Sequence, residues 1–156
     1  MTRSSAGNES VRPGGGRGAA YAGDVPPAEA WALLAGDPAS VLIDVRSLPE
    51  WQFVGVPDLS GLGKRPVLVG WHLYPAMNEN PGFYDELRRK GVEPHMPALF
   101  LCRSGGRSRA AAMAMAAMGY ARCYNVAGGF EGPPDTGRHR GTVGGWKVAG
   151  LPWIQE

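Results

Sequence analysis

The stretch ALFLCRSGGRS, residues 98–108, brings a strand, a tight turn and the start of a helix together in one short segment. Its leading apolar residues predict a buried strand, and Gly105 and Gly106 permit a sharp turn. Residues 108–118 are so rich in Ala and Met that we expect a helix buried on most of its circumference. Ligands of open α/β sheets bind beyond the carboxyl ends of the strands, which is where Cys102 stands. A functional site is therefore predicted at Cys102.

Strand-like and helix-like segments alternate along the rest of the chain. Short apolar runs predict buried strands at residues 41–45, 67–71, 98–101 and 123–126. Capping residues and helical periodicity predict helices from about residue 24 to 36, at 49–53, 81–90 and 108–118, and a short one at 142–146. This alternation indicates the α/β class, with a central mostly parallel sheet and helices on both faces in a three-layer domain.

Length, composition and charge fit one globular domain. A chain of 156 residues has room for one core, and its 24 Gly and 14 Pro indicate many turns. Residues 1–21 are nearly free of large apolar side chains, so we expect a flexible N-terminal arm there and a single domain at 22–156. The net charge of +2 comes without a basic and aromatic cluster, so no nucleic-acid partner is expected.

The sequence also carries an expectation about location. No apolar run approaches the roughly 18–20 residues needed to cross a bilayer, and the N-terminus lacks the apolar segment of a secretory signal. Two cysteines are too few for the disulfide framework of a small secreted domain. We therefore expect a cytoplasmic protein that has no membrane partner.

The turn after Cys102 is suited to holding negative charge. Gly105 and Gly106 can adopt conformations that point successive backbone N–H groups inward, toward the cysteine sulfur. The N-terminus of the following helix adds partial positive charge, and Arg103 and Arg107 add more if their side chains turn inward. Both effects favour a thiolate, so Cys102 is predicted to be a nucleophile. The alternative is a small, inert, buried cysteine.

The length of the turn separates two kinds of cysteine chemistry. Phosphatases that form a cysteinyl-phosphate place an arginine six positions after the cysteine, whereas here Arg107 is fifth and Ser108 is sixth. The shorter ring of amides suits a sulfur atom better than a phosphoryl group. A small phosphatase or arsenate reductase, with Asp135 as a general acid, stays an alternative. A non-catalytic interaction module is a second one.

Several segments resemble the rhodanese family of sulfurtransferases. The family's active loop, Cys-Arg-Ser-Gly-x-Arg-Ser, is matched by residues 102–108. Further matches lie at 42–46 with 50–51, at 124–130 and at 145–153. The resemblance thus spans roughly residues 22–153 and implies a rhodanese-like doubly wound domain. One departure follows Gly55, where many relatives have Gly-His-Ile-Pro-Gly-Ala but this chain has no such histidine and carries an insertion through Lys64.

The resemblance implies a catalytic cycle and its residues. Cys102 would take sulfane sulfur from thiosulfate or a persulfide donor, hold it as a persulfide and pass it to a thiophilic acceptor. Its partners would be a small anionic sulfur donor and a thiol or protein sulfur acceptor, with no metal and no organic cofactor. The substrate-binding residues carried over by position are those whose backbone amides cradle the persulfide: Arg103, Ser104, Gly105, Gly106, Arg107 and Ser108.

Other polar residues have weaker assignments. A basic cluster is formed by Arg138, His139 and Arg140. It could attract an anionic donor to the site, and the alternative is that it is an ordinary solvated loop. Cys123 is expected to be buried packing, with a resolving thiol for oxidised Cys102 as the alternative. The pair Asp44 and Arg46 is expected to hold its turn through hydrogen bonds, or through an ion pair between Arg46 and Glu50.

Overall fold

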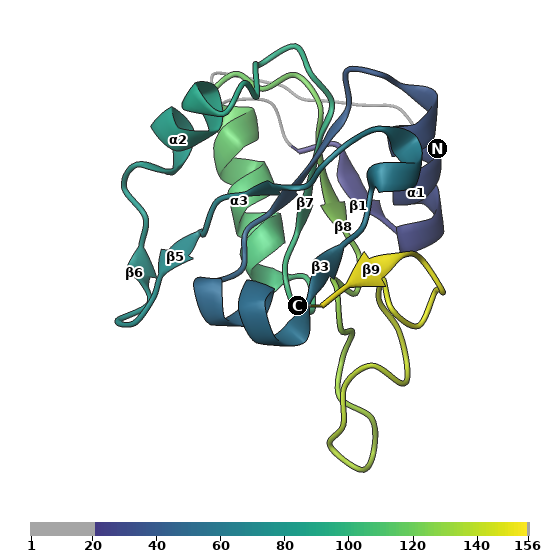
Figure 1. Cartoon of the computed structure of the whole chain (residues 1–156). Coiled ribbons are helices and arrows are strands. Elements are labelled where there is room, and N and C mark those ends of the chain that lie inside the picture. Colours follow the sequence, from purple (N-terminus) through teal and green to yellow (C-terminus); the bar gives the residue numbers. More distant parts are fainter. Residues whose placement is uncertain (1–20, 156) are drawn as a thin grey trace.

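A five-stranded parallel sheet forms the centre of the computed structural model, which describes residues 21–155 (Figure 1). The strand order is β1 (Gly23–Val25), β8 (Cys123–Val126), β7 (Ala98–Leu101), β2 (Val41–Asp44) and β4 (Val67–Leu68). Every neighbouring pair runs parallel. The strands predicted at 98–101 and 123–126 are confirmed residue for residue. The predicted N-terminal arm lies outside the described residues except for Tyr21.

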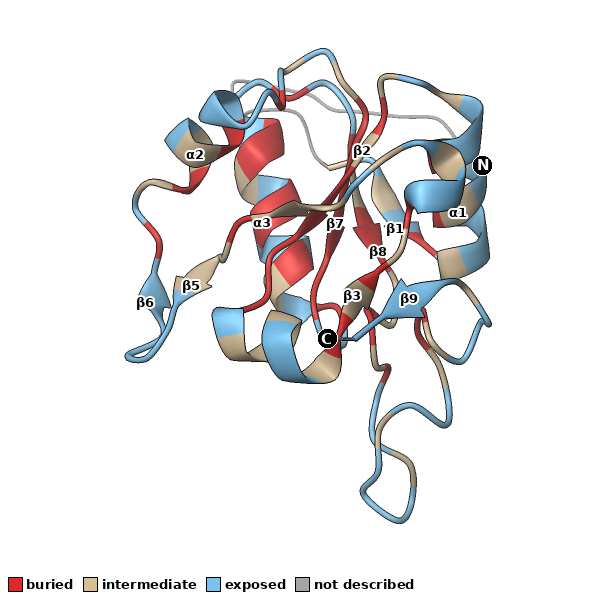
Figure 2. Ribbon diagram, viewed as in Figure 1, coloured by how far each residue is buried: buried red, intermediate tan, exposed pale blue. Residues whose placement is uncertain are grey.

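Helices cover both faces of the sheet, which confirms the predicted three-layer class. Helix α1 (Pro27–Gly36) lies on one side, and α2 (Phe83–Arg89) and α3 (Gly106–Ala117) lie on the other (Figure 1). Alternate side chains of β7 enter different cores: Leu99 and Leu101 pack in the α1 core, and Ala98 and Phe100 pack in the core that contains α3. The strand is buried on both faces because a doubly covered parallel sheet leaves it no solvent side (Figure 2).

Helix α3 is less buried than predicted. Only one face packs on the sheet, and Met113 and Met118 are 53% and 52% exposed. The reason is its place in the outer layer, with the sheet on one side and solvent on the other (Figure 2). A run of Ala and Met therefore indicated a helix correctly but overstated its burial. The helix also begins two residues earlier than predicted, at Gly106.

Two further predictions are wrong in extent. The strand at 67–71 is a strand only over Val67–Leu68, although the amides of Val69 and Trp71 still bind carbonyls of β2 and Val45. No helix forms at 142–146, where the chain makes consecutive turns. Gly145 has φ +98° there, a left-handed conformation that an α-helix does not contain.

Several short elements were not predicted or differ in type. A π-helix at Glu50–Val54, labelled η1, replaces the helix predicted at 49–53, and a 3-10 turn, η2, lies at Ser60–Leu62. Two small antiparallel sheets pair β3 (Val56–Pro57) with β9 (Trp153–Ile154) and β5 (His72–Leu73) with β6 (Asn78–Glu79). No helix among residues 21–155 is long and apolar enough to cross a membrane.

Candidate functional site: the cysteine loop

Cys102 lies at the carboxyl end of β7, just before the turn that leads into α3. Its Sγ atom accepts a hydrogen bond from the Gly105 amide at 3.1 Å, and Ser108 Oγ also lies 3.1 Å from it. Gly105 has φ +120°, which glycine adopts without strain and which turns its amide toward the sulfur. Although Cys102 is only 1% exposed, its sulfur thus faces the loop and is held by polar partners.

The start of α3 supplies further donors on the same loop. Gly106 and Arg107 occupy the first turn of the helix, so their amides have no carbonyl partner within it. Such amides carry the partial positive charge of a helix N-terminus and are suited to bind an anion. Gly105 and Ser108 are buried, whereas the Arg103 and Ser104 residues are exposed. The loop therefore presents buried donors beneath a polar rim.

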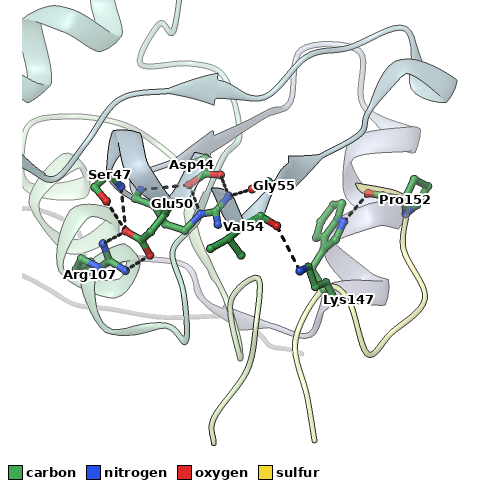
Figure 3. Close-up of polar contacts among 10 residues, drawn as sticks. Asp44, Ser47, Glu50, Val54, Gly55, Arg107, Lys147 and Pro152 are labelled. Atoms are coloured by element: carbon green, nitrogen blue, oxygen red, sulfur yellow. Dashed lines mark hydrogen bonds and ion pairs between the residues drawn. The ribbon is translucent and has the colours of Figure 1, made fainter. Parts of the chain in front are cut away.

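The Arg107 side chain does not turn onto the sulfur, as the sequence left open, but binds Glu50 of η1. Its guanidinium donates two hydrogen bonds to the Glu50 carboxylate, at 2.8 and 3.0 Å (Figure 3). Burial alone would raise the pKa of Glu50, but the hydrogen bonds from Arg107 and Ser47 lower it to about 2. The same hydrogen bonds raise the pKa of Arg107. The pair therefore stays ionised and ties the cysteine loop to η1.

A second ion pair, fully buried, holds the turn after β2. Arg46 donates two hydrogen bonds to Asp44, at 2.9 and 2.7 Å, and a third to the Gly55 carbonyl at 2.8 Å (Figure 3). Its guanidinium also lies 4.4 Å from the centre of the Phe130 ring. The expected hydrogen-bonded turn is confirmed, whereas the alternative pair between Arg46 and Glu50 is wrong because Glu50 binds Arg107.

Behind the loop lies a polar network that sequence reasoning missed. Ser108 Oγ is 2.5 Å from Asn125 Oδ1, and Asn125 Nδ2 donates to Asp24 Oδ1 at 3.1 Å. Asp24 in turn pairs with Arg109 at 2.8 Å. The sequence signal that could have found this network is Asn125 itself, a fully buried amide inside an otherwise apolar strand. A buried amide needs hydrogen-bond partners, which here lead to Cys102.

Cys123 does not lie near enough to Cys102 to act as its resolving thiol. It is opposite Ala98 in the register of β7 and β8, four residues before Cys102. At the rise of an extended strand this places the two cysteines roughly 13 Å apart, beyond the Cα separation that a disulfide tolerates. Burial raises the pKa of Cys123 to about 12. The expectation of buried packing is therefore confirmed.

The basic cluster at 138–140 lies in a loop that projects from the body of the protein (Figure 1). Arg138 and His139 are exposed, and Arg140 donates to the Gly132 carbonyl at 2.7 Å. Asp135 organises the loop by accepting hydrogen bonds from the His139 amide and the Thr142 hydroxyl. A role in attracting an anionic donor stays a prediction.

A separate hollow of about 500 Å³ adjoins η1 on its apolar side. Residues from η1, β3, β4 and β9 line it, among them Trp51, Phe53, Leu68 and Ile154. No residue of the loop at 102–108 belongs to its lining. Among residues 21–155 no group of three or more His, Cys, Asp or Glu is placed to hold a metal ion.

The parallel sheet, the helices on both of its faces and the cysteine loop at the end of a central strand define a rhodanese-like α/β domain. Comparison with known proteins agrees: a family model described as the STR4 middle domain matches residues 23–156. The chain belongs to this rhodanese-like family.

Three proteins of known sequence or structure are similar to this chain. Rv0390 from M. tuberculosis, known from a crystal structure, is 47% identical with a TM-score of 0.81 over 88% of this chain and 100% of that chain. Rhodanese-like domain-containing protein 4, chloroplastic, of Arabidopsis thaliana is 29% identical over 81% of this chain and 24% of its own length. The polysulfide-sulfur transferase homodimer of Wolinella succinogenes, 23% identical with a TM-score of 0.59, covers 85% of this chain and 78% of its own and shares the fold.

Proposed function

We propose that this protein is a sulfurtransferase that carries sulfane sulfur as a persulfide on Cys102. The observation that carries the proposal is the position of Cys102 Sγ. This atom accepts a hydrogen bond from the Gly105 amide and lies beside the Ser108 hydroxyl at the start of α3. Donors in this arrangement favour negative charge on sulfur in both the thiolate and the persulfide. The sulfurtransferase named among the structural relatives is consistent with this chemistry.

The proposed cycle has two displacements at sulfur. In the first, the Cys102 thiolate attacks the outer sulfur of thiosulfate, the sulfur–sulfur bond of the donor breaks, and sulfite leaves with the electron pair. The enzyme then holds Cys102–S–S⁻. In the second, an acceptor thiolate attacks the outer sulfur, takes it as a new persulfide and returns Cys102 as the thiolate. A persulfide donor would replace thiosulfate and leave a thiolate in place of sulfite.

The loop residues have distinct roles in this cycle. The backbone amides from Arg103 to Ser108 would bind the charged outer sulfur, with Gly105 already on Sγ. The exposed Arg103 would attract an anionic donor to the rim. Both cysteines of the chain are free thiols, and we propose a reducing, cytoplasmic setting in which they stay so.

Intact mass spectrometry tests the proposal. After incubation with thiosulfate and removal of the excess, the protein is expected to gain the mass of one sulfur atom. Cys102→Ser should abolish the gain, and Cys123→Ser, the matched control at the other cysteine, should preserve it. Absence of the adduct with thiosulfate and with a low-molecular-weight persulfide would refute the proposed function.

The phosphatase alternative is disfavoured by two contacts. Arg107 is the arginine nearest in sequence to the position that binds phosphate in such enzymes. Its guanidinium already donates two hydrogen bonds to the Glu50 carboxylate. Asp135, the candidate general acid, accepts the His139 amide and the Thr142 hydroxyl, which lower its pKa and so keep it ionised. An ionised carboxylate has no proton to give to a leaving group. Hydrolysis of p-nitrophenyl phosphate that is lost in Cys102→Ser would reverse this conclusion.

A further inference from the structure

The hydroxyl group of Ser108 lies between two hydrogen-bond acceptors. Its Oγ is 3.1 Å from Cys102 Sγ and 2.5 Å from Asn125 Oδ1, and all three side chains are buried. A hydroxyl has one hydrogen, so it can donate to only one of these atoms at a time. The acceptor that it chooses determines whether Cys102 Sγ faces a hydrogen or an oxygen lone pair.

Asn125 is oriented by the neighbouring strand so that its carbonyl oxygen faces Ser108. In the register of β1 and β8, Asn125 lies opposite Asp24, and its Nδ2 donates to the Asp24 carboxylate. Burial raises the pKa of Asp24, but hydrogen bonds from Arg109, Asn125 and Tyr21 outweigh it and lower the pKa. An ionised partner at Nδ2 polarises the amide and makes Oδ1 a stronger acceptor.

Resting on the proposed function, we infer that Asn125 is a positioning residue for the Cys102 nucleophile. While Cys102 is a thiol, Asn125 Oδ1 accepts the Ser108 hydrogen, and the thiol S–H can donate to Ser108 Oγ. When the thiolate forms, the Ser108 hydroxyl rotates and donates to Sγ. Asn125 thereby stabilises the thiol form, and Ser108 stabilises the thiolate.

The proton that leaves Cys102 goes to solvent and not into the network. Asn125 has no group that titrates, and Asp24 is held as a carboxylate. Three ion pairs surround the loop: Arg107 of α3 with Glu50 of η1, Arg109 of α3 with Asp24 of β1, and Arg46 with Asp44 of β2. Arg103 of the loop itself is exposed to solvent. Asp24 and Arg109 form a solvent-exposed pair. Removing the charge of either residue therefore changes the electrostatic potential at Asn125 and Ser108 without changing the number of buried charges.

The test measures how fast Cys102 reacts with iodoacetamide as a function of pH, in a Cys123→Ala background. The readout is the alkylation midpoint, the pH at which the rate reaches half its maximum. Ser108→Ala removes the donor to the thiolate and is expected to raise the midpoint. Asn125→Val removes the competing acceptor and is expected to lower it. Each shift should be about half to one pH unit, as for the gain or loss of one hydrogen bond.

Variants of the exposed pair Asp24 and Arg109 test the same inference without disturbing the buried residues. Asp24→Asn weakens the polarisation of Asn125 and removes a negative charge, so it should lower the midpoint. Arg109→Gln should raise it, because Asp24 is left uncompensated. Arg122→Gln is the matched control, since Arg122 is 54% exposed against 50% for Arg109 and also pairs with an aspartate, Asp37. It should leave the midpoint unchanged.

Opposite shifts in these pairs would support a positioning role, since a purely structural role would lower stability without opposing changes in the midpoint. Shifts of the same sign in Ser108→Ala and Asn125→Val would overturn it, as would equal midpoints in Asp24→Asn, Arg109→Gln and the control Arg122→Gln. If Ser108→Ala or Asn125→Val does not fold, the midpoints of Asp24→Asn and Arg109→Gln decide whether the inference holds. Alkylation by iodoacetamide needs no sulfur donor. Failure to form the persulfide would therefore refute the proposed function, while the alkylation midpoints would still test the role of Asn125.

Discussion

The ion pair between Glu50 and Arg107 connects η1 to the first turn of α3, and its removal gives a quantitative prediction. Glu50→Gln keeps the size of the side chain and removes its charge, as protonation would. The carboxylate accepts both hydrogen bonds from Arg107 and a further pair from the amide and hydroxyl of Ser47. The neutral amide of Gln has only one acceptor oxygen, so Arg107 loses one of the two atoms to which it donates hydrogen bonds.

The expected cost follows from the pKa of Glu50. Lowering this pKa from its ordinary 4.5 to about 2 corresponds to about 3 kcal/mol of folding free energy at neutral pH. The Glu50 side chain is 19% exposed, so solvent screening reduces the expected loss in Glu50→Gln to about 1–2 kcal/mol. Because the folded pKa lies below the unfolded one, this contribution is present above about pH 4.5 and fades as the pH falls toward about 2.

Urea unfolding at pH 7 and at pH 3 measures this effect. The difference in unfolding free energy between the wild type and Glu50→Gln should fall by more than about half at pH 3. Glu86→Gln is the control, because Glu86 of α2 pairs with Lys90, just after the helix, in a more solvent-accessible position, and its loss should cost under about 1 kcal/mol. A difference that is the same at both pH values, or no difference at pH 7, would refute the reasoning.

Three further predictions concern the loop and its supports. Asp44→Ala leaves Arg46 as an unpaired buried charge and should cost about 3–5 kcal/mol in urea unfolding, where a cost below about 1 would contradict the role of the pair. Gly129→Ala would place a Cβ 2.5 Å from the Cys102 carbonyl oxygen, so it should impair both stability and persulfide formation. Gly141→Ala, with φ +85° but no atom within 4 Å, should cost only about 1–2 kcal/mol and spare the activity. Because burial raises the pKa of Cys123 to about 12, Cys102→Ser should resist iodoacetamide at pH 8 when folded and react once it unfolds in urea.

The sequence predicted those parts of the fold whose cause is local. Strand β7 is a continuous apolar run and β8 is apolar except for Asn125, as a doubly covered sheet favours, and both strands begin and end at the predicted residues. The cysteine loop is equally local, because the cysteine, its glycines and the helix start follow one another in the chain. Its predicted turn and its hydrogen bond to sulfur could therefore be inferred without knowledge of the rest of the molecule.

The unpredicted parts depend on residues that are far apart in the sequence. Asn125 and Asp24 are separated by 101 positions and meet only because β1 and β8 pair in one register. Glu50 and Arg107 are separated by 57 positions, so no local pattern favoured this pair over Glu50 with Arg46. Composition also cannot tell how many layers surround a helix, which is why the burial of α3 was overestimated.

These distant contacts hold the short loop from outside its own segment of the chain. Arg107 is drawn outward to Glu50, and Ser108 is anchored inward by Asn125, so adjacent residues of α3 are fixed from opposite sides. The Phe130 and Glu131 amides bind the Cys102 and Arg103 carbonyls and fix the start of the turn. The inner surface of the turn is thereby left to backbone amides and the Ser108 hydroxyl. Under the proposed function, a ring of that kind would select its substrate by size and charge, and it would favour a single anionic sulfur over a phosphoryl group that needs a free guanidinium.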